Sequence, residues 1–178
     1  MSAQVNRTIK RPINSSNLIR GVARSESSKR GVLAQTVGFH IARAAVVAYE
    51  AFERHIGEPY DLRKVDYSLL MLLREHERLA PKRLTRLLAL TPPKLSMVLE
   101  RLQSRGLILR SPDPTDRRSV QVALTGEGAM LAEQLEPVAR VMERGLRQRL
   151  SSAEHAELIR LLEKLADGDE ARRTTAGA

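Results

Sequence analysis

Two adjacent arginines and a nearby aspartate are the most chemically distinctive group in this 178-residue sequence. Asp116, Arg117 and Arg118 lie in "RSPDPTDRRSVQVALTGEG", between a short apolar run and an alternating strand pattern. Arginine stays charged, and its planar fork of donors matches phosphates and base-edge acceptors. The aspartate could orient an arginine, and Pro112 and Pro114 stiffen the segment. The pattern predicts a hairpin whose tip contacts nucleic acid. The alternative is a hairpin tip that serves only solubility.

Two short helices are predicted before this hairpin, at residues 81–89 and in "LTPPKLSMVLERLQSRG". Thr91 suits the N-cap of the second helix, Pro92 its first turn, and Gly106 its C-terminal stop. The pair forms a helix-turn-helix pattern. Apolar residues recur at helical spacing along the buried face of the second helix: Leu95, Val98, Leu99 and Leu102. The opposite face is expected to point outward and presents Lys94, Met97, Arg101 and Arg105.

The second helix and the hairpin tip are therefore the predicted DNA-contacting surface. A helix of this kind fits the major groove, and an adjacent hairpin can insert an arginine into the minor groove. The predicted contacts are Thr91, Pro93, Lys94, Ser96, Met97 and Arg101 from the helix and Asp116, Arg117 and Arg118 from the hairpin. Phosphate contacts are also expected among Lys82, Arg83 and Arg86. The alternative for both helices is an ordinary solvated basic face.

The remaining elements place this surface in a mostly α fold with a small β-hairpin wing, a winged helix-turn-helix. Apolar periodicity predicts a helix over 32–56, ended by Gly57 and Pro59, and another over 64–76. The hairpin strands have Leu107 and Leu109 on one side of the turn and residues 119–124 on the other. Thr125 caps a long helix that Pro137 should kink, and Ser151 or Ser152 caps a final amphipathic helix.

Positive charge is confined to two parts of the chain. The net charge is +9, with +6 in residues 1–31, +7 in residues 62–125, and −2 in each of the other two segments. Clustered positive charge is typical of nucleic-acid binders. The chain has no cysteine, which excludes disulfides and thiolate chemistry and fits a cytoplasmic location. No membrane span or secretory signal is predicted.

Five segments are predicted along the chain. They are a basic, disordered arm (1–31), an N-terminal dimerisation helix and linker (32–61), a winged helix-turn-helix DNA-binding domain (62–125), C-terminal dimerisation helices (126–168) and a frayed tail (169–178). The arm either tracks DNA or hangs free. Its composition also loosely fits an organellar transit peptide. The terminal helices have wide apolar faces that one winged-helix domain would cover only in part, which favours a homodimer.

Together these motifs resemble the MarR family, the multiple-antibiotic-resistance regulators. The family's wing reads D-x-R, then a strand, then L-T-x-x-G, and the matching residues here are Asp116, Arg118, Leu124, Thr125 and Gly128. "LTPPKLSMVLERLQSRGLI" is similar to its recognition helix, and the resemblance covers about residues 33–167. It implies a homodimeric repressor released by a small aromatic ligand. Arg118 would be the minor-groove arginine, Asp116 its orienting partner and Arg117 a phosphate contact.

The resemblance also implies an effector crevice between the dimerisation helices and the winged helix. The candidates there are Phe39, His40, Arg43, Tyr60 and Tyr67. Arg43 or His40 could pair with a ligand carboxylate, and the aromatic rings could stack on the ligand. A salt bridge across the dimer is the alternative for Arg43. The lack of cysteine argues against the peroxide-sensing branch of the family.

The sequence thus predicts a sequence-specific, DNA-binding transcriptional regulator, a repressor that binds a pseudo-palindromic operator. No cofactor, metal site or catalytic residue is expected: Glu75, His76 and Glu77 are adjacent and point in different directions on a helix, and no nucleophile–base arrangement is visible. Two alternatives stay open. One is an architectural protein that coats DNA without reading its sequence, and the other is a winged-helix protein-interaction module.

Overall fold

The computed structural model describes residues 31–113 and 119–175, with side chains as far as Ala166. The chain divides into two compact units, and the boundary lies between Tyr49 and Glu50. In the first unit a short 3-10 helix, η1 (Val32–Gln35), is followed by α1 (Val37–Phe52), which continues past the boundary. The predicted basic arm lies outside the described residues, apart from Gly31.

The helical path does not end at Gly57 as predicted. A π-helical turn, η2 (Glu53–Gly57), and the short helix α2 (Glu58–Tyr60) continue it. Pro59 is tolerated because it stands in the first turn of α2, where an N–H has no intrahelical partner. The path ends at Asp61, whose φ of 48° is left-handed. Residue pattern alone does not show this wider turn, because π-helical turns are rare insertions in α-helices.

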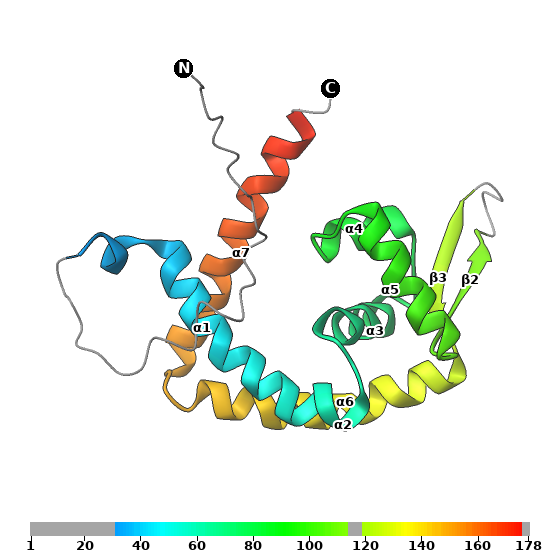
Figure 1. Ribbon diagram of the computed structural model, residues 1–178, viewed down its shortest axis with the longest axis horizontal. Helices are drawn as coiled ribbons and strands as arrows, with labels where there is room; N and C mark the ends of the chain where they lie inside the picture. The colour runs from blue at the N-terminus through cyan, green and yellow to red at the C-terminus, as the bar shows by residue number, and fades with distance from the viewer. Residues whose placement is uncertain (1–30, 114–118, 176–178) are drawn as a thin grey trace, which may run out of the picture. The chain divides into compact units, whose positions relative to one another are not determined.

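The second unit contains the helix-turn-helix, its wing and two long C-terminal helices (Figure 1). The elements are α3 (Lys64–His76), β1 (Arg78–Leu79), α4 (Pro81–Leu87), α5 (Pro92–Ser104), β2 (Ile108–Pro112), β3 (Val120–Leu124), α6 (Gly126–Arg147) and α7 (Ser152–Thr175). The predicted helices and the hairpin are confirmed. α6 runs through Pro137 as one helix, and α7 extends to Thr175, beyond the predicted start of the frayed tail.

The strands of the described residues form an antiparallel sheet in the order β1-β3-β2. Arg78 pairs with Ala123 and Ile108 pairs with Leu124. The sequence reading missed β1, because two residues are too few to show an alternating pattern. Within β2, Ile108 is buried and Leu109 is exposed. Leu107 is buried just before the strand begins, so the inward alternation starts at Ile108.

A leucine-rich core in the second unit holds α5 against the other helices and the sheet. Its fully buried members come from η2, from every layer of the winged helix and from α6: Ile56, Leu69, Leu70, Leu73, Leu79, Leu84, Leu102, Ile108, Val122 and Leu135. This core fixes the helix-turn-helix as a rigid support for one exposed face of α5.

Both C-terminal helices begin with side-chain caps. Thr125 Oγ1 accepts a hydrogen bond from Gly128 N at 3.0 Å at the start of α6. Ser151 and Glu154 bond reciprocally at the start of α7, as a capping box requires: Ser151 N donates to Glu154 Oε2 at 2.8 Å, and Glu154 N donates to Ser151 Oγ at 3.3 Å. Of the two predicted caps for the final helix, Ser151 is therefore the one used. The bond from the Ser151 backbone N–H lowers the pKa of Glu154.

Candidate nucleic-acid interface

Helix α5 has one buried face and an exposed N-terminal half. Thr91 precedes it in an extended conformation, and its carbonyl accepts a hydrogen bond from Leu95 N at 3.0 Å. Pro92 and Pro93 occupy the first turn, where the missing proline N–H leaves no helical bond unmade. The predicted buried stripe, Leu95, Val98, Leu99 and Leu102, is confirmed.

The residues predicted to contact DNA from the first two turns of α5 are all exposed. They are Thr91, Pro93, Lys94, Ser96 and Met97. Met97 keeps 65% of its surface accessible, which is high for a large apolar residue on a helix with a well-packed opposite face. A cation, a hydroxyl and an apolar side chain together suit phosphate contact and contact with a thymine methyl group.

Arg101 was expected to point outward from this face, and that orientation is wrong, because its side chain turns toward α3. Its side chain is only 24% exposed and forms an ion pair with Asp66 of α3. Arg101 Nε donates to Asp66 Oδ2 at 3.2 Å, and Nη2 donates to Oδ1. A buried carboxylate requires a charged partner, and a bidentate arginine satisfies it well. Whether Arg101 contacts DNA stays untested, but both of these donor groups already bind a carboxylate within the protein.

Arg105, the C-cap residue directly after α5, is also turned toward the protein. Its guanidinium donates to the backbone oxygen of Asp61 at 2.5 Å and to that of Tyr60 at 3.1 Å. Sequence reasoning placed both arginines outward because their partners, in residues 60–66, are distant along the chain. One signal was available: Arg63-x-x-Asp66 has an acid three residues after a helix start. Arg63 N indeed donates to Asp66 Oδ2 at 3.0 Å.

The wing consists of β2 and β3, which lie beside α5 (Figure 1). Asp113 N donates to Ser119 O at 2.8 Å, and Gln121 Nε2 donates to Asp113 Oδ2 at 2.5 Å. These bonds define the base of the hairpin loop. The predicted tip residues Asp116, Arg117 and Arg118 fall outside the described residues.

Further cations lie around this surface. Lys82, Arg83 and Arg86 are exposed on α4, the first helix of the motif, where phosphate contacts were expected. Arg110 is exposed on β2, and the sequence reading did not select it. Arg110 pairs with the buried Val122, and directly paired residues of an antiparallel sheet share a face, so strand alternation did not indicate its exposure.

The predicted effector residues are divided between the two units. Phe39, His40 and Arg43 lie together on α1: the Phe39 and His40 rings are 5.6 Å apart at 70°, and the Arg43 guanidinium lies 5.6 Å from the Phe39 ring centre. His40 Nε2 is 2.9 Å from the Ala34 carbonyl oxygen. Tyr60 and Tyr67 belong to the second unit.

Tyr67 is half-buried, and its ring meets that of Phe52 edge-on at 5.8 Å. Burial raises the pKa of its phenol, and the nearby carboxylates Glu143 and Glu75 raise it further. The phenol therefore remains protonated as a hydrogen-bond donor, which suits an anionic group if one is bound nearby.

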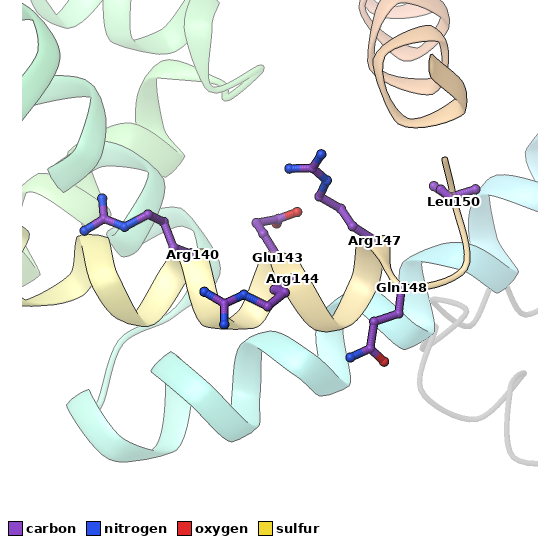
Figure 2. Close-up of a pocket in the computed structure, with 6 residues that line it drawn as sticks. All are labelled: Arg140, Glu143, Arg144, Arg147, Gln148 and Leu150. Atoms are coloured by element: carbon purple, nitrogen blue, oxygen red, sulfur yellow. The ribbon is translucent and has the colours of Figure 1, made fainter. Parts of the chain in front are cut away.

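An open depression of about 490 Å³ lies along the C-terminal half of α6 (Figure 2). Its lining comes from α6 and the connection to α7: Arg140, Glu143, Arg144, Arg147, Gln148 and Leu150. Figure 2 shows Arg140, Arg144 and Arg147 projecting from α6. None of the predicted effector residues lines it.

Comparison with known proteins identifies the architecture. Residues 62–120 match the sequence model of the MarR family. The chain is 33% identical over 132 residues to the HTH-type transcriptional repressor NicR of Pseudomonas putida, covering 74% of this chain and 83% of the relative. The chain belongs to the MarR family. This confirms the resemblance in the wing and recognition helix, and the protein is a DNA-binding transcriptional regulator.

Solved MarR-type structures share the winged-helix fold. BpsR of Bordetella bronchiseptica, described with regulation of its DNA binding by 6-hydroxynicotinic acid, superposes with a TM-score of 0.70 at 28% identity, over 78% of this chain and 98% of that one. A mutant of MarR from E. coli complexed with operator DNA gives 0.67 at 26% identity, over 76% and 99%. In the part of the chain that the structure describes, no helix is long and apolar enough to span a membrane.

Proposed function

We propose that this MarR-family protein is a transcriptional repressor that binds a pseudo-palindromic operator as a homodimer. The observation that carries the proposal is the exposed N-terminal half of α5, with Lys94, Ser96 and Met97 beside a two-stranded wing. This half of α5 enters the major groove, and Arg118 of the wing tip enters the adjacent minor groove, with Asp116 orienting it and Arg117 on a phosphate. The operator complex of a MarR protein among the structural neighbours supports this mode.

Homodimerisation is supported by apolar side chains left exposed on the terminal helices. On α1 they are Val37, Ile41 and Val47, and on α7 they are Leu158, Ile159, Leu161, Leu162 and Leu165. Exposed apolar surface on this scale marks an interface. We assign dimerisation to residues 32–61 and 126–168 and DNA binding to residues 62–125. A two-fold dimer matches half-sites separated by about one helical turn, roughly 34 Å.

We further propose that a small aromatic acid releases the repressor from DNA. Regulation of BpsR by 6-hydroxynicotinic acid supports this effector class. On α1 the cation of Arg43 lies over the ring of Phe39 beside His40, a combination that suits a carboxylate on a ring. Such a ligand acts only if it prefers the form of the dimer that cannot bind DNA. The proposal assigns no catalytic reaction to the chain and places it in the cytoplasm with the DNA that it binds.

Selection of genomic DNA fragments by the purified protein, at about 150 mM salt, tests the proposal. A recovered palindrome beside a small number of genes supports a specific repressor. Fragments that share no sequence support the architectural alternative, for which specific and nonspecific affinities are nearly equal. The absence of retained DNA supports the protein-interaction module. Titration of the protein bound to the recovered duplex with 6-hydroxynicotinic acid then tests the effector class by measuring the release of DNA. 2-Hydroxypyridine, which lacks the carboxylate, is the control.

A further inference from the structure

Two arginines, one on α5 and one at its C-cap, bind one short segment of the chain. Arg101 forms its ion pair with Asp66 in the first turn of α3, and Arg105 donates to the backbone oxygens of Tyr60 and Asp61. The arginines are four residues apart, so they lie one above the other on the same side of the helix. Both therefore attach the C-terminal half of α5 to residues 60–66, which we call the clamp segment.

Asp66 is the centre of this attachment. Its side chain is 1% exposed, and it is the charged residue within the core of the described chain. Three groups donate to its two oxygens: Arg63 N, Arg101 Nε and Arg101 Nη2. The carboxylate thus caps the start of α3 and holds α5 at once. A buried ion pair contributes geometric definition more reliably than stability, because desolvation offsets most of the Coulomb gain.

The same face of α5 has two different environments along its length. Lys94 and Arg101 are seven residues apart, two helical turns, and so they point in nearly the same direction. Lys94 is exposed, whereas Arg101 is held by Asp66. The free N-terminal half can therefore enter a groove only in the orientation that the clamped C-terminal half permits.

We propose that Arg101 and Arg105 are positioning residues for DNA recognition, and that through the clamp segment they set the angle at which α5 enters the major groove. The inference rests on the proposed entry of α5 into the groove. It departs from the prediction that Arg101 contacts DNA directly. Loss of the Arg101–Asp66 pair should weaken binding to the operator, which needs exact side-chain placement, and should spare nonspecific binding, which depends on charge alone.

In Asp66→Asn, the effect of charge on DNA affinity and the effect of lost positioning have opposite signs. Asp66→Asn removes a negative charge from a DNA-binding domain, so charge alone predicts equal or tighter binding to every duplex. A positioning role predicts weaker binding to the operator despite that gain. Glu100→Gln is the matched control, because it removes a carboxylate that is exposed on α5 itself and touches neither arginine's partners.

Affinities should be measured for the full chain on the duplex recovered by the selection and on a scrambled duplex of the same composition. For Asp66→Asn we expect roughly tenfold weaker operator binding with unchanged or tighter binding to the scrambled duplex. A loss of folded protein would lower both affinities by the same factor, and thermal melting measures that fraction. Operator binding by Asp66→Asn that equals binding by Glu100→Gln would overturn the proposal.

Arg101→Lys provides a second variant, which keeps the charge and the carboxylate but loses the bidentate geometry. A positioning role predicts that its operator affinity falls while its scrambled-duplex affinity does not. If the operator affinity of Arg101→Lys is unchanged, a point charge at position 101 suffices for operator binding. That result would overturn the positioning role even if Asp66→Asn does not fold. Tight operator binding by the wild-type protein supports the proposed function on its own, so the variants then test only the positioning role of Arg101 and Arg105.

Discussion

Gly128 lies where the chain leaves no room for a side chain. A Cβ at this position would stand 1.9 Å from the backbone oxygen of Leu107. The same carbonyl accepts a hydrogen bond from Thr125 N at 3.1 Å, and Thr125 Oγ1 donates to Gly106 O at 2.6 Å. The start of α6 is thereby joined to the chain between α5 and the wing, through contacts that depend on a glycine.

Gly128→Ala should therefore destabilise the fold. The contact is with backbone rather than a flexible side chain, so the helix must move, at a cost of about 2–3 kcal/mol. The melting temperature should fall by roughly 5–10 °C. Gly126→Ala is the control, since a Cβ there meets nothing within 4 Å. If both variants melt at the same temperature, the close approach does not contribute to stability.

Glu136 predicts a pH dependence. Arg74 Nε donates to Glu136 Oε1 at 2.7 Å, which links α3 to α6, and this bond lowers the pKa of Glu136 from its ordinary value of 4.5. A lowered folded-state pKa contributes stability above the unfolded-state pKa and loses it as the pH falls through the folded-state value. The wild type should therefore lose this contribution below about pH 4.5, and Glu136→Gln should lack it at neutral pH.

Urea unfolding at neutral and at acid pH measures this effect. The difference in unfolding free energy between wild type and Glu136→Gln should be larger at neutral pH and shrink in acid. Glu133→Gln, which removes an exposed carboxylate one turn earlier on α6, serves as the control. A difference that does not change with pH would show that Glu136 acts by packing and not through its charge.

At the scale of elements, α5 should make the electrostatic contribution that its exposed half suggests. Lys94→Ala removes one exposed cation, which we propose contacts phosphate, so it should weaken binding to the operator and to the scrambled duplex alike. The slope of log affinity against log salt should become shallower by about 1. Lys164→Ala, which removes the same charge from α7, is the comparison. Equal slopes for the two variants would place Lys94 away from DNA.

The elements were more predictable from sequence than their orientations. Periodicity and capping residues located α3, α5 and α6, because local spacing and caps such as Thr125 set helix boundaries. β1 was missed because it exists only by pairing with β3, a contact between distant segments. The environment of Arg101 was missed for the same reason: Asp66 is 35 residues away in sequence.

At the scale of the whole molecule, the apolar side chains that stay exposed in the single chain indicate where a second copy can bind. Charge predicted a nucleic-acid binder, and the wing motif predicted its family, before any fold was known. Sequence could not show whether the apolar stripes of the terminal helices are used within the chain. In the structure, side chains on α1 and α7 remain substantially exposed in the single chain, which leaves them available to a second copy.

Leu162→Glu should therefore separate the homodimer into monomers. Leu158, Leu162 and Leu165 follow one side of α7 at spacings of four and three residues, and each is exposed by more than two fifths. A carboxylate in the middle of this stripe would be buried without a partner in the dimer, at a cost of about 3 kcal/mol or more for each copy. Analytical ultracentrifugation should find a monomer, and this monomer should bind an isolated half-site weakly and the full palindrome no better.

Lys164→Glu introduces a carboxylate on another side of the same helix and should leave the dimer intact. If Leu162→Glu sediments as a dimer with full operator affinity, the α7 stripe is not the interface, and the exposed side chains of α1 become the surface to test next.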